Sequence, residues 1–364
     1  MTTALWITVL LLAFANGAND NAKGVATLRG SGLASDTVAI LWGTFWTFFG
    51  ALLSAQIGTK LIALFNGNGL LPAEEIGRPD LLLTVGLASG GTVLFASRIG
   101  APISTTHALT GALIGTGAAA FGIGPLRIET LGKGIVLPLL VSPLLSLGLT
   151  LLLFSFLRPL RRFAESCICL VRREPVIVSE QALAQSQSAP PAEIVIGTAA
   201  ECRSVAGADR FTPLNGIHWL SAGLMSFSRG LNDTPKIAAL LLGIGFGPTK
   251  GWAIGGIALA MAVGGMLGAR RISRILSERI TPMDPVQGFS ANLITALLVA
   301  GASHVGMPVS TTHVSCGSLF GIGLLHRNRT DWRLVGQILL SWGITLPLAA
   351  LLGAVLYGIL ETFL

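Results

Sequence analysis

Charged residues are scarce in this chain. Asp, Glu, Lys and Arg make up 11% of its 364 residues, whereas hydrophobic residues make up 52%. A water-soluble domain carries about 25% charged residues, so this scarcity excludes an ordinary soluble protein. Apolar stretches long enough to cross ~30 Å of hydrocarbon recur along the sequence. The composition therefore predicts an all-α polytopic protein of the cell membrane, surrounded by lipid, with about 10–12 membrane segments.

Residues that bind metals or perform catalysis are also few. The chain has five His and four Cys, and the cysteines show no C-x-x-C or zinc spacing. No H-E-x-x-H motif or other nucleophile–base set is present, so we expect no enzyme activity, no metal and no cofactor. An intramembrane enzyme stays an alternative, because Asp and His each recur in both halves. The net charge of +7 comes mainly from loops between apolar spans, so we expect no nucleic acid as a partner.

One polar interval divides the apolar sequence. It covers residues 158–213, begins with "RPLRRFAESCICLVRR" and continues through "SEQALAQSQSAPPAE". The first part is strongly basic, which is typical of a cytoplasmic loop, and the second is of low complexity. We therefore predict a first transmembrane repeat at 1–157, a cytoplasmic and largely disordered linker at 158–213, and a second transmembrane repeat at 214–364.

Two motifs occur once in each half, which indicates an internal repeat. "FANGANDNAKGVATL" at 14–28 aligns with "FSRGLNDTPKIAALL" at 227–241, and "GAPISTTHALTGALIG" at 100–115 aligns with "GMPVSTTHVSCGSLFG" at 306–321. Basic segments at 158–173, 269–279 and 326–333 all face the cytoplasm only if the halves cross the membrane in opposite directions. Secondary transporters often have this architecture, with substrate bound near the midplane. We predict two inverted-topology repeats with broken helices and re-entrant or half-helix segments.

The first motif places charges inside an apolar span. The first half has Asn16, Asn19, Asp20, Asn21 and Lys23 there, and the polar residues that recur in the second half are Asn232, Asp233 and Lys236. Asp or Lys at membrane depth costs several kcal/mol unless it is paired or hydrated. The Asp-to-Lys spacing allows an ion pair across one helical turn, and a salt bridge that only fixes packing is the alternative. Because Gly-Asn-Asp can leave carbonyls unpaired, we expect helices to end at this motif, with spans at 4–16, 214–229 and 236–247.

The second motif is Pro-x-Ser-Thr-Thr-His. We expect Pro102 and Pro308 in the first turn of a half-helix. The hydroxyls and free N–H groups that follow would form an anion site at its amino end. The residues concerned are Ser104, Thr105 and Thr106, and Ser310, Thr311 and Thr312. His107 and His313 are candidates for a proton relay, and a structural hydrogen bond is the alternative.

These doubled motifs, Phe-x-x-Gly-x-Asn-Asp and then Pro-x-Ser-Thr-Thr-His, resemble those of the inorganic phosphate transporter family (the PiT-type permeases). The resemblance covers nearly all of the chain outside 158–213. It implies an inverted-repeat helical fold, usually a homodimer, with phosphate between the halves near the Asp motifs and the Ser-Thr-Thr segments. In the family, sodium ions, or protons in some members, drive uptake.

This sequence departs from the family's first motif, which typically reads Gly-Ala-Asn-Asp-Val-Ala-Asn. Lys23 stands where that Asn would be, and the second repeat again has Lys, at Lys236. In sodium-coupled members the Asn resembles a cation ligand. Our hypothesis is that the two ammonium groups replace two bound sodium ions, so that transport is sodium-independent. The rival hypothesis is that each Lys turns toward the substrate and binds the anion.

The sequence thus favours secondary-active transport of inorganic phosphate by alternating access. H⁺ and Na⁺ both stay open as the coupling ion. A permease for sulfate or another oxyanion, coupled to protons, and an anion channel are the alternatives. The expected substrate ligands are Asn19, Asp20, Ser104, Thr105, Thr106, Asn232, Asp233, Ser310, Thr311 and Thr312.

Overall fold

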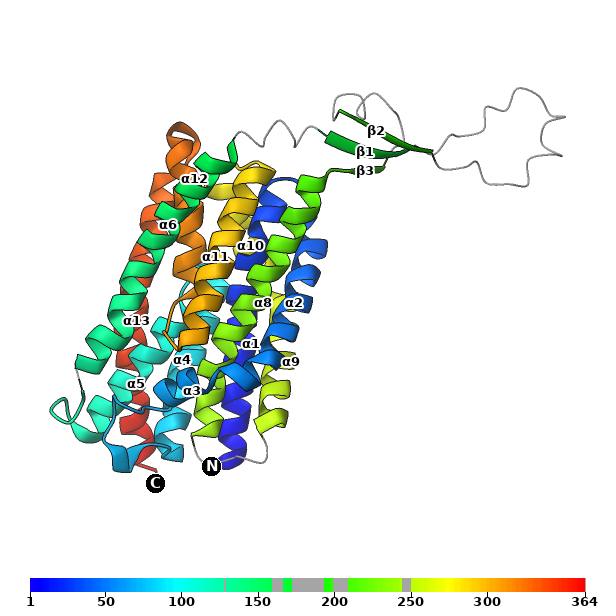
Figure 1. Ribbon diagram of the computed structural model, residues 1–364. Helices are drawn as coiled ribbons and strands as arrows, with labels where there is room; N and C mark the ends of the chain where they lie inside the picture. The colour runs from blue at the N-terminus through cyan, green and yellow to red at the C-terminus, as the bar shows by residue number, and fades with distance from the viewer. Residues whose placement is uncertain (128, 159–165, 172–192, 199–208, 244–249, 364) are drawn as a thin grey trace, which may run out of the picture.

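The structure is a computed structural model that describes residues 1–127, 129–158, 166–171, 193–198, 209–243 and 250–363. Figure 1 shows a bundle of long helices, with both chain termini at one end and three short strands beyond the other. Large apolar side chains such as Phe95 and Phe156 are exposed on the helices. An outer surface of this kind suits hydrocarbon rather than water.

The helices of the two halves correspond in order. The first half contains α1 (Thr2–Gly30), α2 (Asp36–Ile57), α3 (Thr59–Phe65), α4 (Pro79–Ile99), α5 (Thr105–Phe121) and α6 (Leu137–Leu157), with short turns η1 (Ala73–Glu75) and η2 (Thr130–Val136). The second half contains α8 (Pro213–Leu242), α9 (Lys250–Gly268), α10 (Arg270–Arg274), α11 (Pro285–Val305), α12 (Thr311–Leu325) and α13 (Trp332–Glu361), with η6 (Ile275–Arg279) and η7 (Arg327–Arg329). The equivalent pairs are therefore α1 and α8, α2 and α9, α4 and α11, α5 and α12, and α6 and α13.

In the described part of the chain, seven helices are long and apolar enough to cross a membrane: α1, α2, α4, α6 with η2, α9, α11 and α13. Three further helices complete the bundle. Helix α8 is equally long but carries charges, whereas α5 and α12 are shorter. The prediction of an all-α polytopic membrane protein is confirmed, and these ten helices agree with the predicted number of segments.

The expectation that helices end at the first motif is wrong. Helix α1 runs without a break from Thr2 to Gly30, and α8 runs from Pro213 to Leu242 even though Pro235 lies inside it. The Asn and Asp side chains of the motif find hydrogen-bond partners on other elements. With their side chains bound elsewhere, these residues do not compete with the helical backbone for hydrogen bonds.

The interruption at the second motif is confirmed. Helix α4 ends at Gly100, whose φ of +83° suits glycine, and α5 begins at Thr105 with Ser104 as its N-cap. Helices α11 and α12 repeat this geometry around Gly306 and Ser310. The prolines lie two residues before each N-cap rather than in the first helical turn, so that detail of the prediction is wrong.

The two helical hairpins reach toward each other from opposite ends of the bundle. Figure 1 shows α4 and α5 toward the end that carries the termini, and α11 and α12 toward the other end. Their tips meet, because the Thr312 hydroxyl donates to the carbonyl of Ile103 at 2.7 Å and the Thr106 hydroxyl donates to that of Val309 at 3.4 Å. Each hairpin thus ends deep inside the protein.

Equivalent helices run in opposite directions. Helix α1 starts at the end that carries the termini, whereas α8 starts at the end near the strands (Figure 1). The halves also interlock, since α1 packs against α9, α2 against α8, α5 against α13, and α6 against α12. This arrangement agrees with inverted repeats, although neither half forms a separate body.

The linker contains structure that the sequence did not predict. Strands β1 (Ser166–Val171), β2 (Glu193–Thr198) and β3 (Asp209–Phe211) form an antiparallel sheet in the order β2-β1-β3. The low-complexity segment, which was predicted to be disordered, lies outside the described residues.

Candidate functional site

The ammonium group of Lys23 is surrounded by oxygen atoms from both halves of the chain. Lys23 is only 1% exposed. It donates to the carbonyl of Ile103 at 2.9 Å and to the amide oxygen of Asn19 at 3.1 Å. It also contacts the carboxylate of Asp20 and the hydroxyl of Thr312. Helix α1 therefore inserts its cation between the tips of both hairpins.

Lys236 occupies the equivalent position in the second half. Its ammonium donates to the carbonyl of Val309 at 2.7 Å and to the hydroxyl of Thr106 at 2.9 Å, and it pairs with Asp233 at 3.6 Å. The ligand types match those around Lys23: a hairpin carbonyl, a threonine hydroxyl from the opposite hairpin and an aspartate three residues before the lysine. The sequence repeat therefore corresponds to two similar sets of oxygen atoms, one around the ammonium of Lys23 and one around that of Lys236. We call each set an oxygen cage.

Asn16 connects the two aspartates at the centre of the molecule. Its side-chain nitrogen lies 3.0 Å from Oδ2 of Asp20 and 3.3 Å from Oδ2 of Asp233. The same nitrogen lies 3.0 Å from the hydroxyl of Thr105, which is within 3.3 Å of Asp20. On the other side, the hydroxyl of Thr311 donates to Asp233 at 3.4 Å. The carboxylates of the two halves therefore face one shared amide.

The first-motif asparagines hold the hairpins in place. Asn19 donates to the hydroxyl of Ser97 at 3.1 Å and to the carbonyl of Ala101 at 3.0 Å. In the second half, Ser303 donates to Asn232 at 3.1 Å, and Asn232 donates to the Val309 carbonyl at 3.2 Å. These asparagines face the hairpin backbone, so their first role is to position it.

Ser104 and Ser310 cap the hairpin helices. The side-chain oxygen of Ser104 accepts the N–H of His107 at 3.1 Å, and that of Ser310 accepts the N–H of His313 at 3.2 Å. Such caps satisfy one of the free donors at a helix N-terminus. The positive ends of two helix dipoles thus meet at the buried centre.

The two second-motif histidines lie against each other. Their ring centroids are 4.4 Å apart, and Trp342 stacks on His313 at 3.9 Å. Nδ1 of His313 donates to the carbonyl of Leu139 at 3.1 Å. Nδ1 of His107 and Nε2 of His313 have no hydrogen-bond partner in the described part of the chain. The structural hydrogen bond expected as an alternative is therefore present for His313, and the relay stays a proposal.

The motif glycines permit close helix crossings. A Cβ on Gly17 would lie 2.0 Å from the carbonyl oxygen of Met261 on α9, and one on Gly230 would lie 2.3 Å from that of Thr47 on α2. Helices α2 and α9 are themselves equivalent. The crossing brings the polar face of each motif to the centre.

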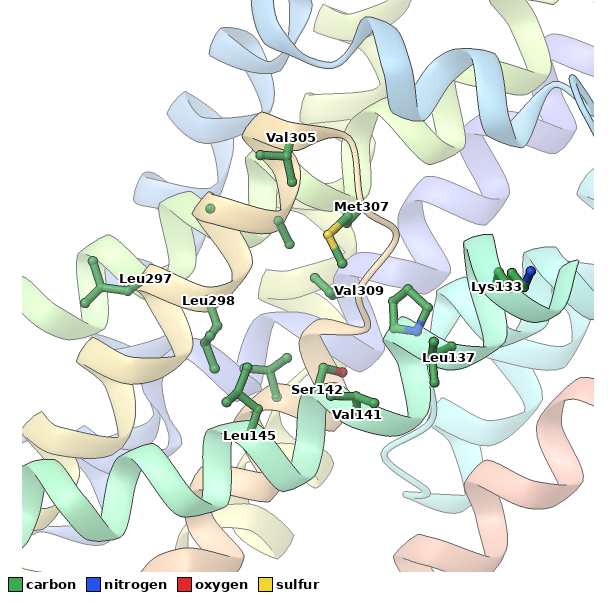
Figure 2. A pocket seen from close by; sticks show the side chains of 14 residues that line it. Lys133, Leu137, Val141, Ser142, Leu145, Leu297, Leu298, Val305, Met307 and Val309 are labelled. Carbon is green, nitrogen blue, oxygen red and sulfur yellow. The ribbon is translucent and has the colours of Figure 1, made fainter. Parts of the chain in front are cut away.

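The larger cavities do not coincide with this polar centre. One cavity of about 520 Å³ lies between α6 and the α11–α12 hairpin, and its lining is almost entirely apolar. Figure 2 shows Met307 and Val309 of the hairpin with Val141 and Leu145 of α6 around it. A second, of about 530 Å³, is lined by His107 and His313 but otherwise mainly by apolar residues. Neither is lined by the residues of the first motif.

The structure brings together most of the predicted site residues. Those of the first motif and the hairpin tips form one buried cluster at the junction of the halves. Sequence reasoning missed Asn16, Ser97 and Ser303 as members. The repeat could have revealed the two serines, because they lie at equivalent positions, three residues before Gly100 and Gly306.

The fold and this cluster define a class: a polytopic helical membrane protein with a buried polar centre between two hairpins. The sequence profile of the Phosphate transporter family matches residues 16–353, so the chain belongs to that family. Members of the family are transporters, and the chain is therefore a transporter rather than an enzyme.

Relatives match along nearly the whole chain. A Bacillus subtilis protein described as "Probable low-affinity inorganic phosphate transporter" is 26% identical over 99% of this chain and 97% of its own. A Rhizobium meliloti protein of the same description is 27% identical over 96% and 93%. A solved structure titled "The sodium-dependent phosphate transporter" superposes with a TM-score of 0.78 over 100% of this chain and 99% of that chain. At 22% identity, that likeness shows a shared fold.

Proposed function

We propose that this protein carries inorganic phosphate across the cell membrane by alternating access and without sodium. One observation carries the proposal: each motif lysine places its ammonium in a cage of oxygen atoms. Hard cations prefer such oxygen ligands, and an ammonium can only donate hydrogen bonds to them. Lys23 and Lys236 then supply, covalently, the charge that two bound sodium ions would supply.

The contacts support this role over the rival one in which the lysines bind the anion. Lys23 is directed at four oxygen atoms of the protein, and Lys236 at three. An anion would have to displace one of these partners to reach either ammonium. Charge balance points the same way, because each lysine lies beside the carboxylate that it neutralises.

The proposed substrate site lies where the N-termini of helices α5 and α12 face Asp20 and Asp233. Helix N-termini attract anions through their free N–H groups and dipoles. Hydroxyls of the Ser-Thr-Thr segments add further donors, and the ten expected substrate ligands remain the proposed set. Thr105 and Thr311 lie beside the carboxylates, to which their hydroxyls donate in this structure, so each would turn its single O–H donor to reach the anion.

The two carboxylates support phosphate rather than sulfate as the substrate. Phosphate carries a proton and can donate to an acceptor, whereas sulfate only accepts. A carboxylate that faces sulfate gains no donor from it, which disfavours sulfate, and the lysines that already engage both carboxylates weaken this discrimination. The family of this chain, whose members carry phosphate, supports the same substrate.

Burial supports a carrier over a channel. Asp20 and Asp233 are 1% and 2% exposed, and Asn16 is fully buried. A channel needs a continuous wet pore, whereas a carrier closes around its site. Rocking of the halves around the hairpin tips would open the site to one side and then the other. A counterflow assay tests this point, because trans-stimulated exchange marks a carrier.

A proton is the coupling ion that this site favours once sodium is excluded. The adjacent His107 and His313 rings are its proposed relay. The protein would act as a homodimer, as the family resemblance implies, with linker 158–213 in the cytoplasm between the repeats at 1–157 and 214–364. Cross-linking in membranes and protease access to the linker from each side test the dimer and the orientation.

Uptake of radiolabelled phosphate and sulfate into liposomes, with sodium and pH gradients imposed separately, tests the whole proposal. We expect the rate of phosphate uptake to be independent of the sodium gradient and to rise with an inward proton gradient. Sulfate uptake of equal rate would contradict the assigned substrate, and steep dependence on sodium would contradict the role of the lysines.

A further inference from the structure

The buried centre contains more positive than negative charge. Asp20 and Asp233 each have a lysine beside them. Arg229, on α8, adds a third cation, and it is fully buried. His107 and His313, the other titratable groups at the hairpin tips, add no negative charge. Buried charges persist only when they are compensated, and the described residues of the centre supply one negative charge too few.

Two of the three guanidinium nitrogens of Arg229 have no hydrogen-bond partner among the described residues. Its Nη1 donates to Oδ1 of Asn16 at the long distance of 3.4 Å. Its Nε and Nη2 have no partner in the described part of the chain. A buried donor without an acceptor is costly, and more so when it is charged. The free edge of this guanidinium can therefore take an acceptor that the described residues do not supply.

Its position places that free edge beside the hairpin tips. Arg229 and Thr105 contact opposite atoms of one Asn16 side chain, Oδ1 and Nδ2. Asn16 also touches both aspartates. The guanidinium is therefore one amide side chain away from the N-terminus of α5, where the proposed anion site lies.

We propose that Arg229 is the cationic ligand of the transported anion. This inference rests on the proposed function and adds the residue that recognises the oxyanion. A guanidinium presents parallel N–H donors that match two oxygens of phosphate, which an ammonium cannot do. The lysines are already engaged with protein oxygens, so Arg229 is the cation with donors to spare among the described residues of the centre.

The assignment also explains an asymmetry between the repeats. Arg229 is equivalent to Asn16, each lying four residues before the motif aspartate. Two arginines would raise the surplus charge further, and two asparagines would remove it. One Arg and one Asn at these equivalent positions give a single anion ligand, which the Asn contacts.

Binding of inorganic phosphate to the purified full-length protein, measured by calorimetry and by the phosphate-induced shift in Tm, tests this assignment. Arg229→Gln removes the positive charge. Arg229→Lys keeps the charge but loses the parallel N–H donors of the guanidinium. Arg270→Gln, at an exposed position on α10, is the matched control. We expect Arg229→Gln to weaken phosphate binding by about 10- to 100-fold, Arg229→Lys to weaken it less, and the control to bind as the wild type does.

A structural role for Arg229 gives a different result. Arg229→Gln would then lower Tm while the dissociation constant for phosphate stayed unchanged, and that outcome overturns the inference. If the Gln variant does not purify as a single species, unchanged binding by Arg229→Lys overturns it instead. Wild-type protein that binds sulfate but no phosphate contradicts the proposed function alone, because the same variants then test Arg229 with sulfate. Wild-type protein that binds neither anion overturns both.

Discussion

The ammonium of Lys236, in the second half of the chain, lies 2.9 Å from the hydroxyl of Thr106, in the first half. Lys23 and Thr312 make the reciprocal contact. Each lysine thus ties the long helix of its own half to the hairpin of the other. The two ammonium groups that we propose as replacements for bound cations therefore also connect the two halves.

Replacing both lysines by the residue of the family pattern should create dependence on sodium. In the double variant Lys23→Asn with Lys236→Asn, two aspartates lose their counter-charges while the carbonyl and hydroxyl oxygens of the cages remain. We expect phosphate uptake into liposomes to be slow in choline and to recover when sodium is added.

Lys133→Asn is the matched control for this pair of substitutions. Lys133 is 80% exposed and pairs with Glu129 at the surface, so its replacement should leave uptake and its indifference to sodium unchanged. A double variant that folds but stays inactive in sodium would show that the cages cannot accept the free ion.

Breaking one buried ion pair should cost stability that removal of both partners restores. Asp20→Asn leaves Lys23 buried without its carboxylate, and such a change typically costs about 3–5 kcal/mol. Asp20→Asn with Lys23→Gln removes the unpaired charge, so we expect a higher thermal midpoint for the double variant than for the single one. Equal midpoints would mean that water or another group compensates the lysine.

Replacing a helix glycine by alanine should destabilise the protein only where a neighbouring helix leaves no space for the added Cβ. Gly17→Ala places a Cβ against the Met261 carbonyl, and we expect a loss of about 1–3 kcal/mol from overpacking with less folded protein in size-exclusion profiles. Gly255→Ala on α9 is the control, because nothing lies within 4 Å of its added Cβ. Equal yields for the two variants would contradict the close crossing.

Filling the cavity beside the second hairpin should slow transport without weakening binding. Gly301 on α11 lines that cavity, and no atom lies within 4 Å of an added Cβ. If the hairpin uses this space as it moves, Gly301→Leu lowers the uptake rate several-fold and leaves the dissociation constant for phosphate unchanged. Gly251→Leu, at an exposed and open position on α9, should leave both quantities unchanged. Undiminished uptake by Gly301→Leu would mean that the hairpin moves elsewhere.

The hairpins could be predicted from the sequence because their signals are local. Gly100 and Gly306 permit the left-handed turn, and Ser104 and Ser310 supply the caps. The repeat then showed which residues are equivalent. The equivalence of two helices does not show which other helices they pack against. The packing of α1 against α9 and of α5 against α13 therefore appeared only in the structure.

The unbroken path of α1 and α8 could not be predicted for a related reason. Gly, Asn and Asp weaken a helix when water or their own backbone is the only partner. Here Asn19 and Asn232 bind hairpins that lie some eighty residues further along the chain. A separation of 213 residues conceals the contact between Arg229 and Asn16. The linker strands carry no local signal strong enough to predict them.

Uptake by the wild-type protein in sodium and in choline is the most direct test of the central claim that two lysines take the place of two cations. Liposomes that contain the unmodified chain would take up radiolabelled phosphate under the same inward pH gradient in both salts. The account predicts equal initial rates in the two salts. Uptake that needs sodium and rises steeply with its concentration would contradict it.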